Sequence, residues 1–482
     1  MDYRLSSKTR CAILVLLITL ACGESSPEKV GDLKNAASSR ILSRNYLQNL
    51  NRNVSIAIIG GGFSGLSAYQ RLLSVENDGY LQHGAQFING EQNPIFEIAA
   101  RMGLLTGNIE DDSLFENANY QTGSCRIETN HIDEFERFVD QLESDYMQLS
   151  KDRQTWNLTV GVLYRESYRI FINSKQRTKD ELRSFEALSR FYQTYYEGEW
   201  SAPIEKLSLR NFAIWDDRTE DKASSYTLDK RGYAPILEEL SQNLPSVHLN
   251  SKIALIDYSG LKTRLKLIDG QFHSTEYDYV ISTVPLGHLK AHAKHLFHPQ
   301  LPKRKLDAIS AFGFGSLLKV FLVYEKPFWS QNMTSLIPIF VDGCGSESYL
   351  SRDLHTFEPL DWNKNVLVGW LSGEGPKNID NLSDEELAKH ITKHFRETVP
   401  DTNIPLPKQI IRTSWLRDDN FRGSYTYLTA EAAARFQNDP FELLARPVYL
   451  NNRPRILFAG EATHSRIYQT VIGAYLSGST RS

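Results

Sequence analysis

Apolar and polar positions along the chain follow two different periods. Residues 54–59 (VSIAII) are almost continuously apolar, which is typical of a strand buried in a parallel sheet. Residues 132–149 and 179–196 instead carry apolar side chains three and four positions apart, which predicts amphipathic helices. Strands and long helices in one chain favour a mixed α/β fold. Further strands are predicted at 247–258, 264–268, 277–284, 317–324 and at the apolar start of 456–464, and a further helix at 383–396.

The N-terminal segment has the pattern of a secretory signal peptide. Three basic residues within the first ten precede an apolar run at 11–22, which is too short to span a bilayer but suits the core of a signal peptide. Small residues follow at the spacing that a signal peptidase prefers. We therefore expect residues 1–23 to be a signal peptide and 24–50 a flexible lead-in. The protein would be secreted or would reside in the lumen of the secretory pathway, without a membrane span after cleavage. An uncleaved N-terminal anchor is the alternative.

Glycosylation signals and cysteines agree with export. The sequence has several N-x-S/T sequons, which are possible sites of N-glycosylation. The sequon at Asn53 stands too close to the first buried strand to be a good glycan acceptor, so the remaining sequons are the better candidates. After cleavage only Cys125 and Cys344 would remain, and they could pair, although two cysteines form no disulfide framework. Four sequons of the type N-x-S/T are present: Asn53, Asn157, Asn332 and Asn381.

The length of the chain indicates the number of domains, and its net charge indicates which partners are not expected. A chain of 482 residues exceeds what one hydrophobic core usually serves, so two or three domains are expected. The 54 basic and 58 acidic side chains give a net charge of −4, which provides no electrostatic reason to expect nucleic acid or an anionic membrane as a partner.

Three glycines follow the first buried strand at the spacing of a dinucleotide-binding turn. Gly60 would permit the tight turn, Gly62 would let a pyrophosphate approach the backbone, and Gly65 would let the next helix pack against the strand. The positive end of that helix would then lie against the phosphates. This arrangement predicts a dinucleotide cofactor.

Two charged residues in apolar surroundings are further candidates for cofactor binding or catalysis. Glu461 follows a predicted strand and could bond a ribityl or ribose hydroxyl; the alternative is an acid favoured at a helix N-terminus by the macrodipole. Lys319 is the only charge in the apolar segment SLLKVFLVY. Such a lysine is either buried with a lowered pKa, as catalysis can require, or extends to solvent from an edge strand.

Seven blocks of sequence, in order, resemble the flavin-dependent amine oxidases, and within them the polyamine and spermine oxidases. The resemblance covers the chain from Val54 onward. It implies a Rossmann-like FAD-binding domain interleaved with a substrate domain built of a sheet and helices. The blocks lie at 56–68, 84–99, 232–240, 278–290, 312–329, 421–427 and 458–478.

The resemblance also implies how the chain is divided and what it binds. The FAD-binding domain would comprise 50–90, 225–312 and 440–482, and the substrate domain 91–224 and 313–439. The partners would be a small-molecule amine, such as a polyamine or acetylated polyamine, and O2; no metal is expected. Residues implied to contact FAD are Gly60, Gly62 and Gly65 at the pyrophosphate, Ile253 at the adenine, Glu461 along the FAD chain, Thr470, Val471 and Trp415 at the flavin, and Lys319 through a water that faces flavin N5.

The sequence departs from the family in the flavin-binding region. The family has a second strand ending in an acid for the adenosine ribose, followed by a GGR segment. Here Glu76 comes only 11 residues after Gly65, where about 20 are expected, so both elements are missing. We expect this loss to leave neighbouring strands unpaired and to weaken flavin binding. Within the active site, Asn89 stands where the family has a histidine, and Ile472 opens the block that reads H-G-A in the family.

Other functions remain possible from the sequence. A truncated or non-catalytic member of the family would act by binding alone. An L-amino acid oxidase on the same fold would need an arginine clamp for the substrate carboxylate, and the region that could supply it is missing. A histone lysine demethylase is disfavoured by the signal peptide and by the lack of extra domains.

Overall fold

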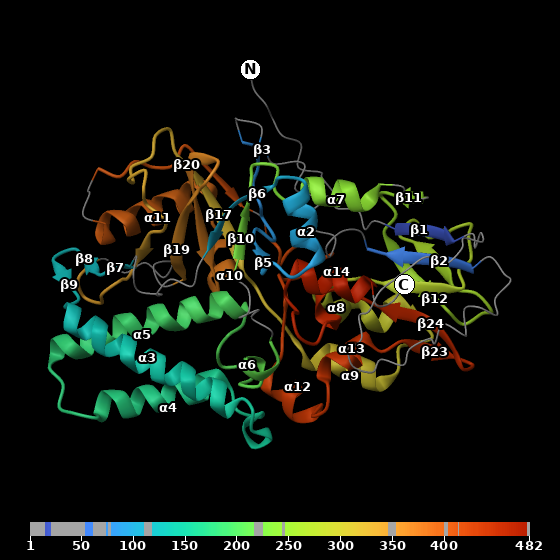
Figure 1. Ribbon diagram of the computed structural model, residues 1–482, viewed down its shortest axis with the longest axis horizontal. Coiled ribbons are helices and arrows are strands. Elements are labelled where there is room, and N and C mark those ends of the chain that lie inside the picture. Colours follow the sequence, from blue (N-terminus) through green and yellow to red (C-terminus); the bar gives the residue numbers. More distant parts are fainter. Residues whose placement is uncertain are drawn as a thin grey trace.

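The computed structural model shows two large β-sheets toward opposite ends of the long axis of the molecule, with helices around both and several smaller sheets besides (Figure 1). It describes residues 15–20, 54–60, 74–75, 79–109, 118–215, 225–242, 246–345, 353–399, 403–412 and 414–479.

The first sheet has six strands in the order β11-β1-β2-β14-β24-β23. At its centre, β2 (Val54–Ile59), β14 (Tyr279–Ser282) and β24 (Arg453–Phe458) run parallel to one another. These are strands that the apolar runs predict, and their near-continuous apolar sequences agree with burial between neighbouring strands. The sheet thus draws strands from all three segments expected to form the FAD-binding domain, although the exact boundaries of that domain stay a prediction.

One strand of this sheet was not expected. β1 (Val15–Leu20) pairs antiparallel with all six residues of β2 and also with β11 (Ser246–His248). The expectation that a missing second strand leaves the edge of β2 unpaired is therefore wrong, because β1 satisfies the backbone groups of that edge. The same residues form the core of the predicted signal peptide, so its cleavage, which stays a prediction, would remove β1 and leave this edge of β2 unpaired.

The second sheet has four antiparallel strands in the order β19-β20-β17-β21. β17 (Leu318–Val323) lies inside this sheet, between β20 (Asn363–Leu371) and β21 (Gln409–Arg412), and confirms the strand predicted there. The two outer strands are β21 and β19 (Leu354–Leu360). Lys319 therefore does not lie on an edge strand.

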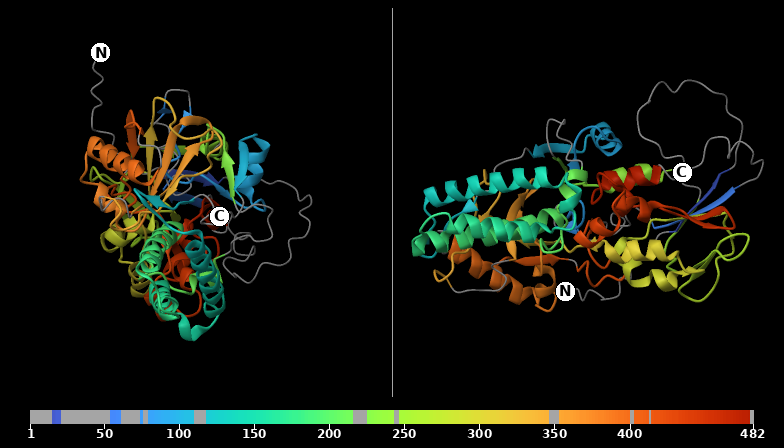
Figure 2. Two further views of the ribbon diagram at one scale, coloured as in Figure 1. Left: turned by 90° about the vertical axis from the view of Figure 1, so that its left-hand side faces the viewer. Right: turned by 90° about the horizontal axis from the view of Figure 1, so that it is seen from below.

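Three long helices pack side by side below the four-stranded sheet as drawn in Figure 1, and Figure 2 shows the same layer from two other sides. They are α3 (Thr129–Leu149), α4 (Val160–Asn173) and α5 (Lys179–Trp200), and the first and third confirm the two predicted amphipathic helices. α5 begins at a capping box formed by Thr178 and Glu181, which satisfies two backbone N–H groups at its start.

Shorter elements complete both halves. No helix among the described residues is long and apolar enough to cross a membrane. The main shorter elements are β5 (Ile88–Asn89), α2 (Pro94–Arg101), β6 (Leu105–Ile109), β10 (Ser225–Leu228), α7 (Ala234–Ser241), β12 (Ile253–Asp257), β13 (Arg264–Leu267), α8 (Leu286–Leu296), α9 (Lys303–Ala311), α11 (Asp384–Thr398), β22 (Thr426–Tyr427), α12 (Ala430–Arg435), α13 (Pro440–Ala445), β23 (Val448–Leu450) and α14 (Val471–Ser479).

A disulfide joins two distant parts of the chain. Cys125 and Cys344 are bonded, with 5.8 Å between their Cα atoms, so the pairing that the sequence left open is confirmed. The two residues are 219 positions apart in the sequence. The bond links β9 (Cys125–Arg126), just before the helical layer, to the segment that follows β18 (Ile337–Pro338).

Replacing Cys125 by serine is expected to lower the free energy of unfolding by about 2–4 kcal/mol, because the bond restricts the unfolded chain over a long loop. The measurement is urea unfolding under non-oxidising and oxidising conditions. Reduced wild-type protein should match the Cys125→Ser variant under both conditions. Equal stability of oxidised wild type and variant would contradict the prediction.

Candidate active site

A cavity of about 530 Å³ lies between the two sheets. On one side it is lined from the carboxyl ends of β14 and β24, which is where open α/β sheets usually bind their ligands. On the other side it is lined from β17, β19 and β20. Of the residues predicted from the sequence, those that line it are Lys319, Trp415, Glu461, Thr470 and Val471.

The end of β2 requires glycine. Gly60 has a φ of +107°, and a Cβ atom at this position would lie 2.2 Å from Oγ1 of Thr283. Backbone and side chain of Thr283 both donate to the carbonyl of Ile59, which fixes this close approach. The positive φ and the close approach both agree with the glycine expected at position 60, while the turn that follows lies outside the described residues. Gly62 and Gly65 lie outside the described residues.

The predicted adenine contact does not reach the cavity. Ile253 begins β12, where it is buried in the core, and it is not part of the cavity wall. Its expected role, through its backbone, stays a prediction.

Glu461 lies in a short 3-10 turn (Glu461–Thr463) just after β24, rather than at the start of an α-helix. Its carboxylate accepts hydrogen bonds from the hydroxyl of Thr426 at 2.7 Å and from the backbone N–H of Gln469 at 3.0 Å. Burial raises the pKa of Glu461, while these hydrogen bonds oppose that rise. Glu461 is thus the first residue of a very short helix, and specific hydrogen bonds hold its carboxylate in addition to any effect of that helix.

Lys319 is buried, with 4% of its surface exposed. Its Nζ donates to the carbonyls of Gln82 and Gly84, both at 2.8 Å, and to Oε1 of Gln86 at 2.9 Å. It also lies 4.6 Å from the centre of the Trp370 ring. The alternative of a lysine that reaches solvent is wrong, and its three protons are all directed at the segment that lines the cavity.

Burial lowers the pKa of Lys319 to about 7, while the negative charge of Glu358 acts in the opposite direction. Three acceptors suit the three N–H groups of an ammonium. Near pH 7 the side chain therefore exchanges between an ammonium and a neutral amine, which has a lone pair in place of one N–H. Lys319 can hold or release a proton at the cavity within the physiological range.

Sequence reasoning missed the residues that face Lys319 from the neighbouring strands. Trp370 of β20 lies opposite Lys319 in the register, and its Nε1 donates to Oε2 of Glu358 of β19 at 3.2 Å. Phe87 stacks on the same indole, with 6.4 Å between ring centroids. Glu358 is the only carboxylate in β19, a strand that is mostly apolar. A single charge in an apolar strand is also what singles out Lys319, so the same pattern could have identified Glu358 from the sequence.

Aromatic and amide side chains shape the rest of the cavity. Trp415 is 8% exposed and meets Phe421 edge to face at 5.3 Å between centroids. Asn89, in the position of the family's histidine, lies on the cavity wall, and its Nδ2 is 3.4 Å from the hydroxyl of Ser225. An amide there supplies hydrogen bonds but cannot titrate near neutral pH.

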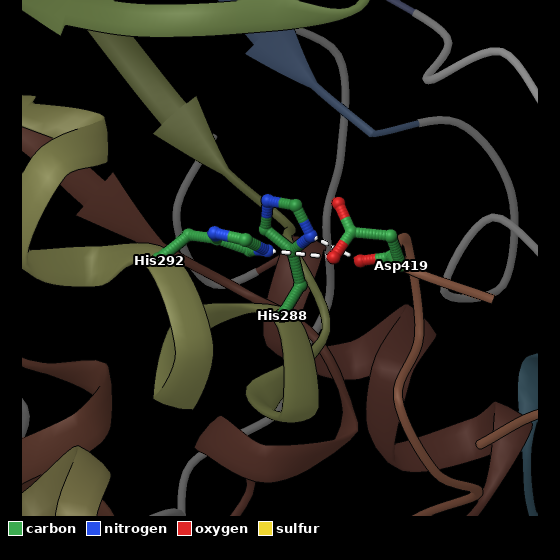
Figure 3. Close-up of side chains that lie close together, drawn as sticks. All are labelled: His288, His292 and Asp419. Atoms are coloured by element: carbon green, nitrogen blue, oxygen red, sulfur yellow. Dashed lines mark hydrogen bonds and ion pairs between the residues drawn. The ribbon is translucent and has the colours of Figure 1, made fainter. Parts of the chain in front are cut away.

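A second polar cluster lies outside the cavity wall. Figure 3 shows His288 and His292, one turn apart on α8, both directed at Asp419, and one donor atom from each of the three lies within 4.8 Å of the others. The carboxylate of Asp419 also pairs with Lys252 and Arg422. Two cationic side chains on the same carboxylate oppose a divalent metal ion. We interpret the cluster as an ion-pair network that holds the loop carrying the cavity's tryptophan against α8.

Fold and cavity together define a class of protein. A parallel sheet with a glycine turn at its carboxyl end is typical of enzymes that bind a dinucleotide cofactor. The second sheet lines the other side of the cavity and contributes a buried lysine whose pKa is lowered to about 7. This arrangement is typical of a cofactor-dependent enzyme with its site between two sheets.

Comparison with known proteins gives the family. The model of the flavin containing amine oxidoreductase family matches residues 64–481. The chain therefore belongs to the flavin-containing amine oxidoreductases, as the resemblance of its sequence blocks implies.

Curated relatives and solved structures agree with this assignment. The bovine and human peroxisomal N(1)-acetyl-spermine/spermidine oxidases are 25% and 26% identical, over 89% and 88% of this chain and 93% of each relative. Human lysine-specific histone demethylase 2 is 26% identical over 93% of this chain but only 54% of its own length. The structure of a putrescine oxidase bound to putrescine aligns with a TM-score of 0.59 and 18% identity, over 88% of this chain and 97% of that one.

FAD is the cofactor of the family, and the described residues fit its flavin end. The hydroxyl of Ser282, at the carboxyl end of β14, is buried on the cavity wall without a hydrogen-bond partner among the described residues. Gly460 has a φ of +122°, and an added Cβ there would meet open space. Glu461, Thr470 and Val471 line the same region. Buried hydroxyl groups normally have a hydrogen-bond partner. The free hydroxyl of Ser282, beside the open space at Gly460, could therefore bond a polar ring such as that of the flavin.

Proposed function

We propose that this protein oxidises polyamines, namely spermine, spermidine or their N-acetylated forms, with O2. The carbon–nitrogen single bond becomes an imine, and water then cleaves the imine to an aldehyde and an amine while O2 becomes H2O2. The observation that carries the proposal is the buried Lys319, which titrates near pH 7 at a cavity that fits a flavin. The names of the bovine and human relatives support the substrate class.

The residues of this chain have separate tasks in that reaction. When bound, the flavin supplies a two-electron oxidant that takes hydride from the carbon next to the amine nitrogen and is reoxidised by O2. Lys319 holds a proton at Nζ and can order a water in the cavity. Trp415 and Phe421 exclude solvent from the reacting carbon. Glu461 fixes the segment around Thr426 and Gln469 at the cofactor side.

A member of the family with impaired catalysis is the second candidate function. The missing second strand and GGR segment favour it, because they supply contacts to the adenosine half of FAD. Such a protein would retain the cavity and bind amines without turnover.

The decisive experiment uses the purified 482-residue protein with added FAD. Anaerobic addition of spermine or N1-acetylspermine should bleach the flavin absorbance, and readmission of O2 should restore it with stoichiometric H2O2. L-amino acids should leave the spectrum unchanged. Bound flavin that no polyamine reduces would support the impaired member instead.

We also propose that the protein is exported and glycosylated. Asn157, Asn332 and Asn381 are exposed, as acceptors must be, and the disulfide suits an oxidising compartment. Secreted material should begin near residue 24 and shift in mass on treatment with an endoglycosidase. Met1 intact on secreted protein, or no shift in mass, would contradict the prediction.

A further inference from the structure

Glu358 is a half-buried carboxylate on the cavity wall, and no cationic side chain among the described residues forms an ion pair with it. Its Oε2 accepts the indole N–H of Trp370 at 3.2 Å. No lysine, arginine or histidine nitrogen lies within ion-pair distance of it among the described residues. The surface that Glu358 keeps accessible belongs to the wall of the cavity. One oxygen is thus held in place, while the group as a whole remains open to a ligand.

The nearest lysine does not neutralise this charge directly. Lys319 influences Glu358 electrostatically, but its three N–H groups are bonded to Gln82, Gly84 and Gln86. Withdrawing a charged carboxylate from water without a paired cation costs free energy of desolvation, so such carboxylates are usually paired. Burial accordingly raises the pKa of Glu358.

Another half-buried carboxylate at the cavity shows the contrast. Glu461 receives hydrogen bonds from Thr426 and Gln469, so neutral protein donors already satisfy it. Among the described residues, Glu358 accepts one side-chain hydrogen bond, from the neutral indole of Trp370. Three glutamates line the cavity, Glu199, Glu358 and Glu461, and Glu199 is exposed. Of the two that are half-buried, Glu461 is held by protein donors, whereas Glu358 can accept further hydrogen bonds.

We propose that Glu358 binds an ammonium group of the amine substrate and makes the site selective for amines with a second cationic nitrogen. The inference rests on the proposed function and names the residue that would select the substrate. The nitrogen next to the oxidised carbon must be neutral, because its lone pair forms the new C=N bond as hydride leaves. The ammonium at Glu358 is therefore a different nitrogen of the same molecule. Trp370 positions the carboxylate through its N–H group.

The proposal predicts selectivity against two classes of compound, monoamines and amino acids. A di- or polyamine gains a charge-assisted hydrogen bond at Glu358, which a monoamine of similar length cannot make. A substrate with a carboxylate would instead meet like charge in a cavity of low dielectric constant. The site should thus favour spermidine over both butylamine and amino acids.

The test compares Glu358→Gln with the wild type. The glutamine amide oxygen can still accept the N–H of Trp370, so the variant removes the charge and keeps the shape. The matched control is Glu197→Gln, since Glu197 on α5 is also half-buried, accepts the N–H of Ile204 at 3.1 Å and is not part of the cavity wall.

Calorimetric binding of spermidine and butylamine to the purified protein, without O2, is the primary measurement. Glu358→Gln should weaken spermidine binding by roughly ten- to a hundred-fold and leave butylamine unchanged, the range for one hydrogen bond to a charged group. The control should bind both amines as the wild type does. Spermidine affinity of Glu358→Gln within about two-fold of the wild type would overturn the inference.

Parallel assays with FAD separate this inference from the proposed function. If the protein oxidises spermidine and Glu358→Gln leaves KM unchanged, the inference fails and the function stands. If no amine is oxidised but spermidine binding depends on Glu358, the inference stands and the function fails. A rise in KM for spermidine with kcat largely kept would support both.

Discussion

Lys319→Met is expected to slow amine oxidation by roughly ten- to a thousand-fold, the range for one positioned group in acid–base or electrostatic catalysis. Among the described residues that line the cavity, Lys319 is the group whose pKa is lowered to about 7, and the substitution removes it. The dependence of kcat on pH near neutrality should therefore disappear together with the rate. Flavin should stay bound, because Lys319 contacts the segment around Gln82 rather than the strand ends at Ser282 and Gly460.

Lys290 provides a matched control for this experiment. Its Nζ also donates to three oxygens, here the backbone carbonyls of Ile309, Ser310 and Phe312, but it is not part of the cavity wall. Lys290→Met should lower stability and leave kcat and its pH profile unchanged. Equal loss of turnover in both variants would show that the effect of Lys319 is structural. Stopped-flow measurement of flavin reduction distinguishes the two results.

Restoring the missing segment is expected to strengthen FAD binding by a thousand-fold or more. A strand ending in an acid, followed by a GGR segment, would be inserted after Leu73. The acid supplies hydrogen bonds worth about 1.5–3 kcal/mol each, and every 1.4 kcal/mol changes the affinity tenfold. Equilibrium dialysis of FAD against both proteins measures the difference. The matched control carries the same insert with asparagine in place of the acid.

Stoichiometric FAD on the purified 482-residue protein would contradict this prediction. The next candidates for the ribose contact would then be Glu76, which lies outside the described residues, and Glu91. The carboxylate of Glu91 already accepts the hydroxyl of Tyr226, so it would have to exchange that partner for the ribose. The inserted strand would also have to displace β1, because β1 pairs with the edge of β2 where the restored strand belongs.

The fold was predictable where local pattern and burial coincide. β17 is apolar because it is buried on both faces, and β2 is apolar although only Ala57 and Ile59 are fully buried, so the sequences of both strands identify them. The burial of Lys319 was predictable from the same pattern, because a single charged residue inside an apolar strand is expected to be buried with the strand. β1 was not predictable, because twelve apolar residues after basic ones suit a signal peptide and a strand equally well.

The parts of the site that depend on register could not be predicted. Trp370 meets Lys319 and Glu358 only because β20 pairs with β17 and β19 in one particular alignment, and no local pattern specifies it. Asp419 reaches His288 and His292 across more than a hundred residues of sequence. Such contacts follow from tertiary packing, which single-sequence periodicity does not contain.

The disulfide imposes an order on events during synthesis. Cys125 leaves the ribosome 219 residues before Cys344, a delay of roughly 10–45 s at ordinary rates of translation. During that interval its thiol has no native partner, whereas Cys11 and Cys22 have already been made. Removal of the first residues by a signal peptidase would take both competitors away before Cys344 emerges. Early processing of the nascent chain would thus leave Cys125 with one cysteine to pair with, and a chain that escaped processing would have three.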